Sequence, residues 1–160
     1  MTQTDFELPQ RKGEAPQVNP GMPHLQLSDN AGEEVYRQMA EWLFALDHIE
    51  EGRSRVSIPS SRAAWVNEEY GPINPIAQRE FTHIHTEPGP GSQHLALTEP
   101  DAEEVLGKGW GEPHPTNPYI PEFELLMIYA PRTDDELEAV KAIITRAYEW
   151  TLDTAGEADA

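Results

Sequence analysis

Histidines are concentrated in one part of this sequence, next to residues that suit proton transfer or metal binding. The stretch HIHTEPGPGSQH, residues 83 to 94, holds three histidines in twelve positions. The segment GWGEPHP follows, with a fourth histidine beside a glutamate. Imidazoles held a few ångströms apart can share a metal ion or pass a proton between them. The first question is therefore whether the fold brings His83, His85, His94, Glu112 and His114 together.

The segments on either side of the turn in HIHTEPGPGSQH are expected to pair as the two strands of a β-hairpin. In REFTHIHTE, His83 and His85 share one face of a strand, while Thr82 and Ile84 share the other. PGPG is read as the turn, and QHLALT as the returning strand. Pairing residue 85 with residue 94 would place the three histidines on one face, with opposed Cβ atoms about 5 Å apart. A slip of one residue would send His94 to the other face.

GWGEPHP is expected to close the site. Its glycines allow a close approach of the backbone, and Trp110 offers a flat wall for an aromatic ligand. Glu112 and His114 supply a carboxylate and an imidazole for general base catalysis. The structural alternatives stay open: Trp110 is commonly a core residue, and His114, between two prolines, would pin its loop to a backbone carbonyl.

Two residues downstream are also candidates for substrate contact. Tyr129 lies on an apolar strand, where its hydroxyl needs a hydrogen-bond partner. Arg132 follows Pro131 and would bind an anionic group, cap carbonyls or pair with Asp134. For Arg132 the structural role is the simpler interpretation.

The residue pattern does not require a bound metal or an organic cofactor. A His-x-His pair on a strand is a weak metal signal, because it needs a third ligand and usually a carboxylate at a defined offset. Glu87 lies in the turn, where its direction is not fixed. We therefore expect no metal and no cofactor. A metal site made of His83, His85 and His94 remains as the alternative.

Several other chemistries find no support in the sequence. The chain has no cysteine, which excludes disulfides, thiolate nucleophiles and Cys-ligated zinc. It has no phosphate-binding loop of the Walker type and no GxGxxG after a strand, so nucleotide binding is unsupported. It also has no GxSxG elbow, which argues against a common serine hydrolase.

The composition restricts the partners. The chain has 160 residues, 38% of them hydrophobic, and a formal net charge of −18. Such a charge disfavours nucleic acid and anionic membrane surfaces. MTQTDFELPQRKGE has no apolar run typical of a signal peptide, and LLMIYA is too short to span a bilayer. We expect a soluble cytoplasmic protein with a small-molecule ligand, and its oligomeric state stays open.

The N-terminal half is expected to contain an arm, a helix and two strands. Residues 1–28 are read as an extended, Pro-rich arm with His24 on the surface. A helix is predicted over 31–50, with Asn30 and Glu33 as its capping pair and His48 in solvent. Short strands are predicted at 55–59 and 62–66, and a loop at 67–77.

The C-terminal half is expected to add two helices and a central strand. Thr98 to Asp101 resembles a capping box, and Gly109 ends the short helix that follows. Residues 109–123 are read as irregular, and 123–131 as a strand covered on both faces. A capping box at Thr133 starts the last helix. Residues 29–153 would form one domain, and 154–160 a flexible acidic tail. This order predicts an α+β fold: a single, mostly antiparallel sheet with about three helices packed on one face.

Several segments together resemble the luciferase-domain family, which is named for the luciferases of bioluminescent fungi and has many small bacterial members. The matching stretches run from LPQRKGEAPQVNPGMPHLQL through RVSIPSSRAAWV and REFTHIHTEPGPGSQHLAL to IYAPRTDDELEAVKAIITRAYEW. The most specific motifs are GS-x-HL, GWGE-x-HP and YAPR, in this order. The positions that these motifs carry over are His94, Trp110, Glu112, His114, Tyr129 and Arg132. His83 and His85 fit the bacterial pattern.

The resemblance implies oxidation chemistry, since the fungal enzymes oxidise a hydroxylated styryl-pyrone with molecular oxygen, without an added organic cofactor or metal. It does not make a small bacterial relative a luciferase. The first hypothesis is an oxygenase-like enzyme in which His94 or His85 deprotonates an enolic aromatic molecule. The second is a non-catalytic binding or interaction domain with solvated histidines. The third is a metal-dependent enzyme that uses His83, His85 and His94.

Overall fold

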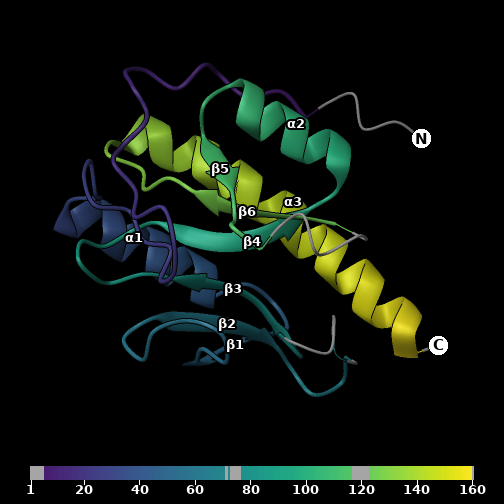
Figure 1. Cartoon of the computed structure of the whole chain (residues 1–160). Helices are drawn as coiled ribbons and strands as arrows, with labels where there is room; N and C mark the ends of the chain where they lie inside the picture. Colours follow the sequence, from purple (N-terminus) through teal and green to yellow (C-terminus); the bar gives the residue numbers. More distant parts are fainter. Residues whose placement is uncertain (1–5, 71, 73–76, 117–122, 160) are drawn as a thin grey trace.

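A six-stranded antiparallel sheet forms the centre of the fold (Figure 1). The computed structural model describes residues 6–70, 72, 77–116 and 123–159, and for residues 155–159 only the backbone. The strands follow the spatial order β1-β2-β3-β4-β6-β5. Their bounds are β1 (Ile49–Arg53), β2 (Arg62–Val66), β3 (Glu80–Ile84), β4 (Gln93–Leu97), β5 (Gly111–Pro113) and β6 (Glu124–Ile128).

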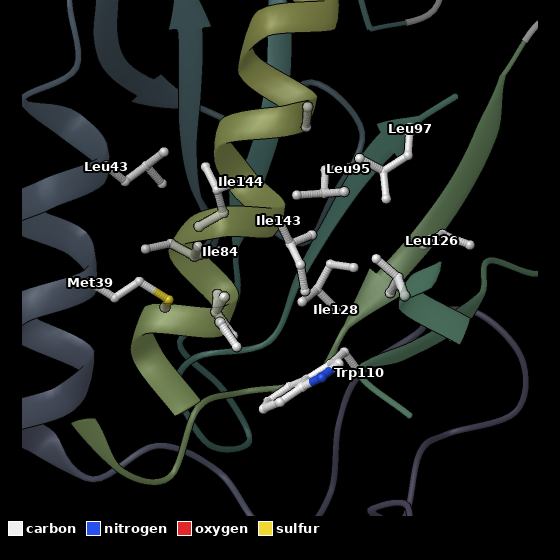
Figure 2. Packing of buried hydrophobic residues seen from close by; sticks show 14 of the residues in the cluster. Met39, Leu43, Ile84, Leu95, Leu97, Trp110, Leu126, Ile128, Ile143 and Ile144 are labelled. Atoms are coloured by element: carbon white, nitrogen blue, oxygen red, sulfur yellow. The ribbon is translucent and has the colours of Figure 1, made fainter. Parts of the chain in front are cut away.

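Three helices complete one hydrophobic core on one face of this sheet. They are α1 (Glu33–Phe44), α2 (Glu99–Gly107) and α3 (Asp134–Asp159). Figure 2 shows how the helix and strand side chains meet, and the cluster includes Met39, Leu43, Ile84, Leu95, Leu97, Leu126, Ile128, Ile143 and Ile144. Burying each such side chain contributes about 1.5–3 kcal/mol. The expected α+β architecture, with one antiparallel sheet and three helices, is confirmed.

The two faces of the sheet differ in chemistry because side chains alternate along each strand. The β3–β4 register places Thr82 opposite Leu95 and His83 opposite His94. Leu95 packs in the apolar core. The His83–His94 pair therefore lies on the face that the helices leave uncovered.

The first helix is shorter than predicted, and the strand beside β2 is a different segment. Helix α1 ends at Phe44 with Ala45 as its C-cap, and His48 takes a left-handed conformation with φ of 70°. This turns the chain into β1, so Ile49–Arg53 pairs with β2. The predicted strand at 55–59 was wrong. The strand prediction for residues 62–66 is confirmed as β2.

Helix caps also depart from the sequence pattern. Gly32, not Asn30, is the N-cap of α1. Thr133 does cap α3, since its hydroxyl accepts a hydrogen bond from the Glu136 backbone N–H at 3.1 Å. Asp101 of the expected capping box turns away and holds Arg146 of α3 through two oxygens, at 2.9 and 3.0 Å. This ion pair ties α2 to α3.

The C-terminal half also differs in detail. Within the stretch predicted as irregular, Gly111–Pro113 is the edge strand β5, paired with β6. Helix α3 continues to Asp159, so the backbone of 154–159 is helical where the sequence suggested a separate tail. The loop predicted at 67–77 and the stretch 109–123 lie partly outside the described residues. No helix in the described part of the chain is long and apolar enough to cross a bilayer.

The N-terminal arm packs on its own domain. Leu8 is buried in the core, and its backbone N–H donates to the Glu104 carboxylate at 2.7 Å. The Arg11 N–H donates to the Lys108 carbonyl at 2.9 Å. Further along, the Ala130 N–H donates to the Gln26 side chain at 2.9 Å. The arm thus crosses from α2 to the end of β6.

Gly91, in the turn between β3 and β4, gives the first prediction. Its φ is +116°, and a Cβ added there would lie 2.8 Å from the Ala31 Cβ and 2.9 Å from the Ala130 Cβ. We expect Gly91→Ala to lower the free energy of unfolding by about 1–3 kcal/mol, because it strains the backbone and pushes Ala31, before α1, and Ala130, after β6, away from the hairpin. Urea denaturation followed by circular dichroism measures this.

Gly107 provides the matched control. It ends α2, and an added Cβ would meet no atom within 4 Å. Gly107→Ala should leave stability unchanged or raise it by up to about 1 kcal/mol, since alanine favours helix. Equal urea midpoints for the two variants would contradict the close packing at Gly91.

Candidate functional site

Five of the six histidines are buried together on the sheet face opposite the helices. The exposed fractions are 3% for His24, 5% for His83, 1% for His85, 6% for His94 and 8% for His114. Contacting ring centroids lie 4.6 to 5.2 Å apart. We call these five residues the histidine cluster. Buried imidazoles in such number require partners for their ring nitrogens.

The hairpin β3–β4 positions three members of the cluster. His83 lies directly opposite His94, and the His85 N–H donates to the Ser92 carbonyl at 2.8 Å. The register therefore differs by two residues from a pairing of residue 85 with residue 94, the pairing considered from the sequence. A shift of two preserves the face of each side chain. The three histidines consequently share one face, as expected.

His94 lies at the centre, and both of its ring nitrogens contact other imidazoles. His94 Nδ1 is 3.0 Å from His83 Nε2, and His94 Nε2 is 2.9 Å from His24 Nδ1. The outer nitrogens of these two neighbours contact carboxylates: His83 Nδ1 lies 2.8 Å from Glu80 Oε2, and His24 Nε2 lies 2.9 Å from Glu112 Oε2. A continuous hydrogen-bonded line thus runs Glu80–His83–His94–His24–Glu112, which we call the imidazole line.

The inner end of the imidazole line is a buried carboxylate. Glu80 is 4% exposed. Besides His83, it accepts hydrogen bonds from the Ser54 hydroxyl and the Arg55 backbone N–H, both at 2.7 Å. Three donors compensate the desolvation of a charged group. Glu80 is therefore built as an acceptor that orients the His83 ring.

The outer end of the line reaches solvent. The Glu112 side chain is 31% exposed, and its Oε1 accepts the Tyr129 hydroxyl at 2.8 Å. Burial raises the pKa of Tyr129, and the hydrogen bond with Glu112 raises it further. Arg11 lies over the Tyr129 ring, 5.2 Å from its centroid. Tyr129 thus acts as a fixed donor that holds the Glu112 carboxylate.

The remaining two imidazoles differ in how their nitrogens are satisfied. His85 Nδ1 is 2.8 Å from the Ser92 hydroxyl, while His85 Nε2 is buried and has no hydrogen-bond partner in the described part of the chain. His114 Nδ1 accepts the Thr116 backbone N–H at 3.1 Å and lies 2.9 Å from the Thr116 hydroxyl. A neutral His114 therefore carries its proton on Nε2.

Burial keeps these imidazoles neutral. Desolvation lowers the pKa of His85 to about 3, with a smaller contribution from His83, His24 and His114. It also lowers the pKa of His114 to about 4. The pKa of His94 falls well below its usual value for the same reason, with the neighbouring imidazoles adding to the effect. Adding charge to this cluster is therefore unfavourable unless a counter-charge is present.

Two predicted substrate-binding residues lie outside the cluster. Trp110 is 2% exposed within the hydrophobic core, and its Nε1 donates to the Pro9 carbonyl at 2.7 Å. Trp110 is therefore a core residue rather than a wall for a ligand, because that hydrogen bond and the apolar packing use the whole ring. Arg132 pairs with Glu136, not Asp134, and donates to the Lys12 carbonyl at 2.7 Å. It fastens the arm to the start of α3.

The sequence reasoning missed two residues of the imidazole line. His24 was expected on the surface, but the arm carries it into the centre of the cluster. Gln26 holds the arm there by accepting the Ala130 N–H and donating to the Ser28 and Asp29 carbonyls. Glu80 was not singled out from the other acidic residues of the sequence. The local feature that could have indicated its contact with His83 is its position three residues before His83.

The depressed pKa values predict how stability depends on pH. The unfolded state binds protons at histidine below about pH 6.5, whereas folded His85 and His114 bind them only near pH 3 and 4. The free energy of unfolding should thus fall as pH drops below about 6.5, by up to about 1.4 kcal/mol per pH unit for each such histidine, and level off above it. Urea unfolding between about pH 4.5 and 8 tests this.

His114→Gln should reduce this slope, because one neutral buried imidazole is removed. His48→Asn is the control, since His48 is exposed, pairs with Glu69 at 2.9 Å and lies outside the cluster. Asparagine also tolerates its left-handed backbone. An equal loss of slope in His48→Asn would contradict the assignment to the cluster.

Comparisons with known proteins place most of this site in a recognised domain. Residues 78–147 match the family described as Luciferase domain. The chain is 40% identical over 84 residues to a luciferase of Armillaria mellea, and 38% identical over 84 residues to one of Neonothopanus nambi. Each alignment covers 50% of this chain and 31% of the relative, so the chain spans about a third of the length of these proteins. No solved structure matches the chain.

The matched segment contains both ends of the imidazole line and four of the five clustered histidines. Only His24 comes from outside it, on the arm. Apart from the arm, the family match therefore covers the strands and side chains that form the imidazole line. Residues 78–147 are therefore assigned to the luciferase-domain family, and the similarity to the fungal luciferases supports this assignment.

Proposed function

We propose that this chain is an oxygenase-like enzyme that oxidises an enolic aromatic or pyrone-like small molecule with molecular oxygen. The observation that carries the proposal is the imidazole line, which joins two carboxylates through three buried histidines. Its solvent-reaching end, Glu112, lies in the segment that matches the Luciferase domain family. That similarity supports the choice of oxidation chemistry.

The first step is removal of the enol proton. Glu112 is the member of the line that solvent reaches, with its side chain 31% exposed. The enol O–H breaks, its proton passes to the Glu112–His24 end of the line, and an enolate remains. His94 continues the line inward from His24, so the accepted charge is shared over the adjoining hydrogen bonds. This assigns proton transfer to the line rather than to His85 or His94 alone.

The second step uses oxygen as the oxidant. The enolate carbon forms a bond to one oxygen atom of O₂, and two electrons pass from the substrate to the oxygen molecule. The proton held by the line returns to the terminal oxygen and gives a hydroperoxide. The sum is substrate plus O₂ to hydroperoxide, with no other reactant. His114 lies beside His94 at the outer part of the cluster, where its Nε2–H can stabilise the developing negative charge.

The binding-domain alternative rests on solvated histidines, and the structure contradicts that premise. Five histidines are at most 8% exposed. Burying five imidazoles and the Glu80 carboxylate costs free energy that apolar side chains would avoid. Such an arrangement is typical of functional sites.

Glu112→Gln provides the test of the proposed base. The amide keeps the size of Glu112 but cannot take up the proton, so we expect kcat to fall about 100-fold or more. Oxygen consumption with a hydroxylated styryl-pyrone, hydroxy-2-pyrones and enolisable diketones measures this. Tyr129→Phe removes only the hydroxyl that holds Glu112, and should reduce kcat less than Glu112→Gln.

His48→Asn again serves as the control and should retain wild-type oxygen consumption. Circular dichroism of each variant confirms that the fold is intact. Wild-type rates in a folded Glu112→Gln variant would rule out the base assignment. The absence of oxygen consumption with every substrate in the panel would count against the reaction class.

A further inference from the structure

We propose that His83, His85 and His94 bind one divalent first-row transition-metal ion. The ligand atoms are His83 Nε2, His85 Nε2 and His94 Nδ1, and His24 with Glu112 supports the site from behind His94. This inference goes beyond the proposed function and rests on the spacing, burial and hydrogen bonds of the histidines. It replaces the expectation, drawn from the sequence, that no metal is bound.

Proximity is the first argument. The ligand atoms that the three residues offer lie within 4.8 Å of one another, and all three side chains are buried. Metal–nitrogen distances near 2.0–2.1 Å place tetrahedral ligand atoms roughly 3–3.5 Å apart. His83 Nε2 and His94 Nδ1 already lie 3.0 Å apart. A paired register between two strands holds them, so little rearrangement is needed.

The second argument is a proton count along the imidazole line. Three imidazoles lie between two carboxylates, which makes four contacts in series. Each contact requires one shared proton, whereas three neutral imidazoles carry only three. The line therefore lacks one positive charge. A metal ion between His83 Nε2 and His94 Nδ1 supplies it, and the remaining three contacts then match the three imidazole protons.

His85 points to the same place independently. Its Nε2 is buried and has no hydrogen-bond partner among the described residues. Its other nitrogen lies 2.8 Å from the Ser92 hydroxyl, which fixes the ring. Its ring centroid is 4.8 Å from that of His94 and 5.2 Å from that of His83. An ion at the His83–His94 contact would satisfy this nitrogen as well.

A second group of three histidines, His24, His94 and His114, also lies within reach of one ion. It fits less well because His114 Nδ1 already accepts the Thr116 N–H, which places the ring proton on Nε2. Neither nitrogen of a neutral His114 is then free to ligate. His24 Nδ1 instead accepts a hydrogen bond from His94 Nε2–H, and His24 Nε2–H donates a hydrogen bond to Glu112. Such carboxylate–histidine support is typical of metal ligands.

The ligand type selects the class of ion. Three neutral imidazoles suit Zn²⁺, Co²⁺, Ni²⁺, Cu²⁺ or Fe²⁺, whereas Mg²⁺ and Ca²⁺ require oxygen ligands. Glu80 and Glu112 contact the outer ring nitrogens of His83 and His24. Their two negative charges balance a divalent ion without entering its coordination shell. Three protein ligands leave a further position for water or substrate, as in catalytic metal sites.

Cobalt titration of the chelator-treated full-length protein tests the site without an activity assay. We expect one Co²⁺ per chain, with the visible absorption of a nitrogen-ligated tetrahedral ion, and displacement of Co²⁺ by Zn²⁺. His85→Ala should weaken Co²⁺ binding more than about 100-fold, beyond the loss typical of supporting residues. His24→Gln, which changes only a supporting residue, should weaken it by about 10–100-fold. His48→Asn, the matched control, should bind as wild type.

Nitrogen-15 spectra of the imidazoles provide a second measurement that needs no variant. Zn²⁺ should shift Nε2 of His83 and His85 and Nδ1 of His94, and leave His48 unchanged. Failure of the wild-type chain to bind Co²⁺, equal binding by a folded His85→Ala variant, or shifts centred on His24 and His114 would overturn the proposal. If Co²⁺ binding fails, the oxygen-consumption test can still support the proposed function. If oxygen consumption fails, the Co²⁺ titration can still support the metal site.

Discussion

The site depends on one pair of side chains, His83 and His94, which face each other across β3 and β4. Their contact occupies one nitrogen of each ring and leaves the other nitrogen to be satisfied in a buried place. Glu80 meets this demand for His83, and His24 meets it for His94. His24 then needs Glu112, which is held in turn by Tyr129. A single buried pair therefore dictates a chain of polar residues drawn from the arm, the start of β3, the edge strand β5 and the end of β6.

The polar face explains why the fold includes a long ordered arm. Helices cover the apolar face of the sheet, and a face of histidines would be hydrated without a cover. The arm is anchored at both ends, by Leu8 in the core and by Gln26 at Ala130. Between these anchors it places His24 over His94, with the two rings stacked at 5.0 Å. Anchoring and chemistry thus depend on the same segment, although the family match begins at residue 78.

Local sequence patterns predicted the features that neighbouring residues determine, such as the face of a strand side chain and the start of a helix. Alternation placed His83, His85 and His94 on one face, and the capping residue Thr133 marked the start of α3. The misplaced helix end and strand near 45–59 reflect the left-handed turn at His48, which tertiary pairing with β2 stabilises. His24 and Glu80 could not be predicted, because their roles come from contacts between segments far apart in the chain. Trp110 shows the converse, since its type suggested a ligand platform while packing made it core.

The hydrogen-bond count also explains why this cluster differs from an ordinary buried polar network. A network of neutral groups can satisfy every donor and acceptor, but three imidazoles between two carboxylates cannot, because one contact always lacks a proton. Some cation must therefore reside in the line. A proton would satisfy the line and still leave His85 Nε2 without a partner among the residues that the structure describes. A metal ion would satisfy both the line and this nitrogen, which is why the proposed ion is placed among His83, His85 and His94.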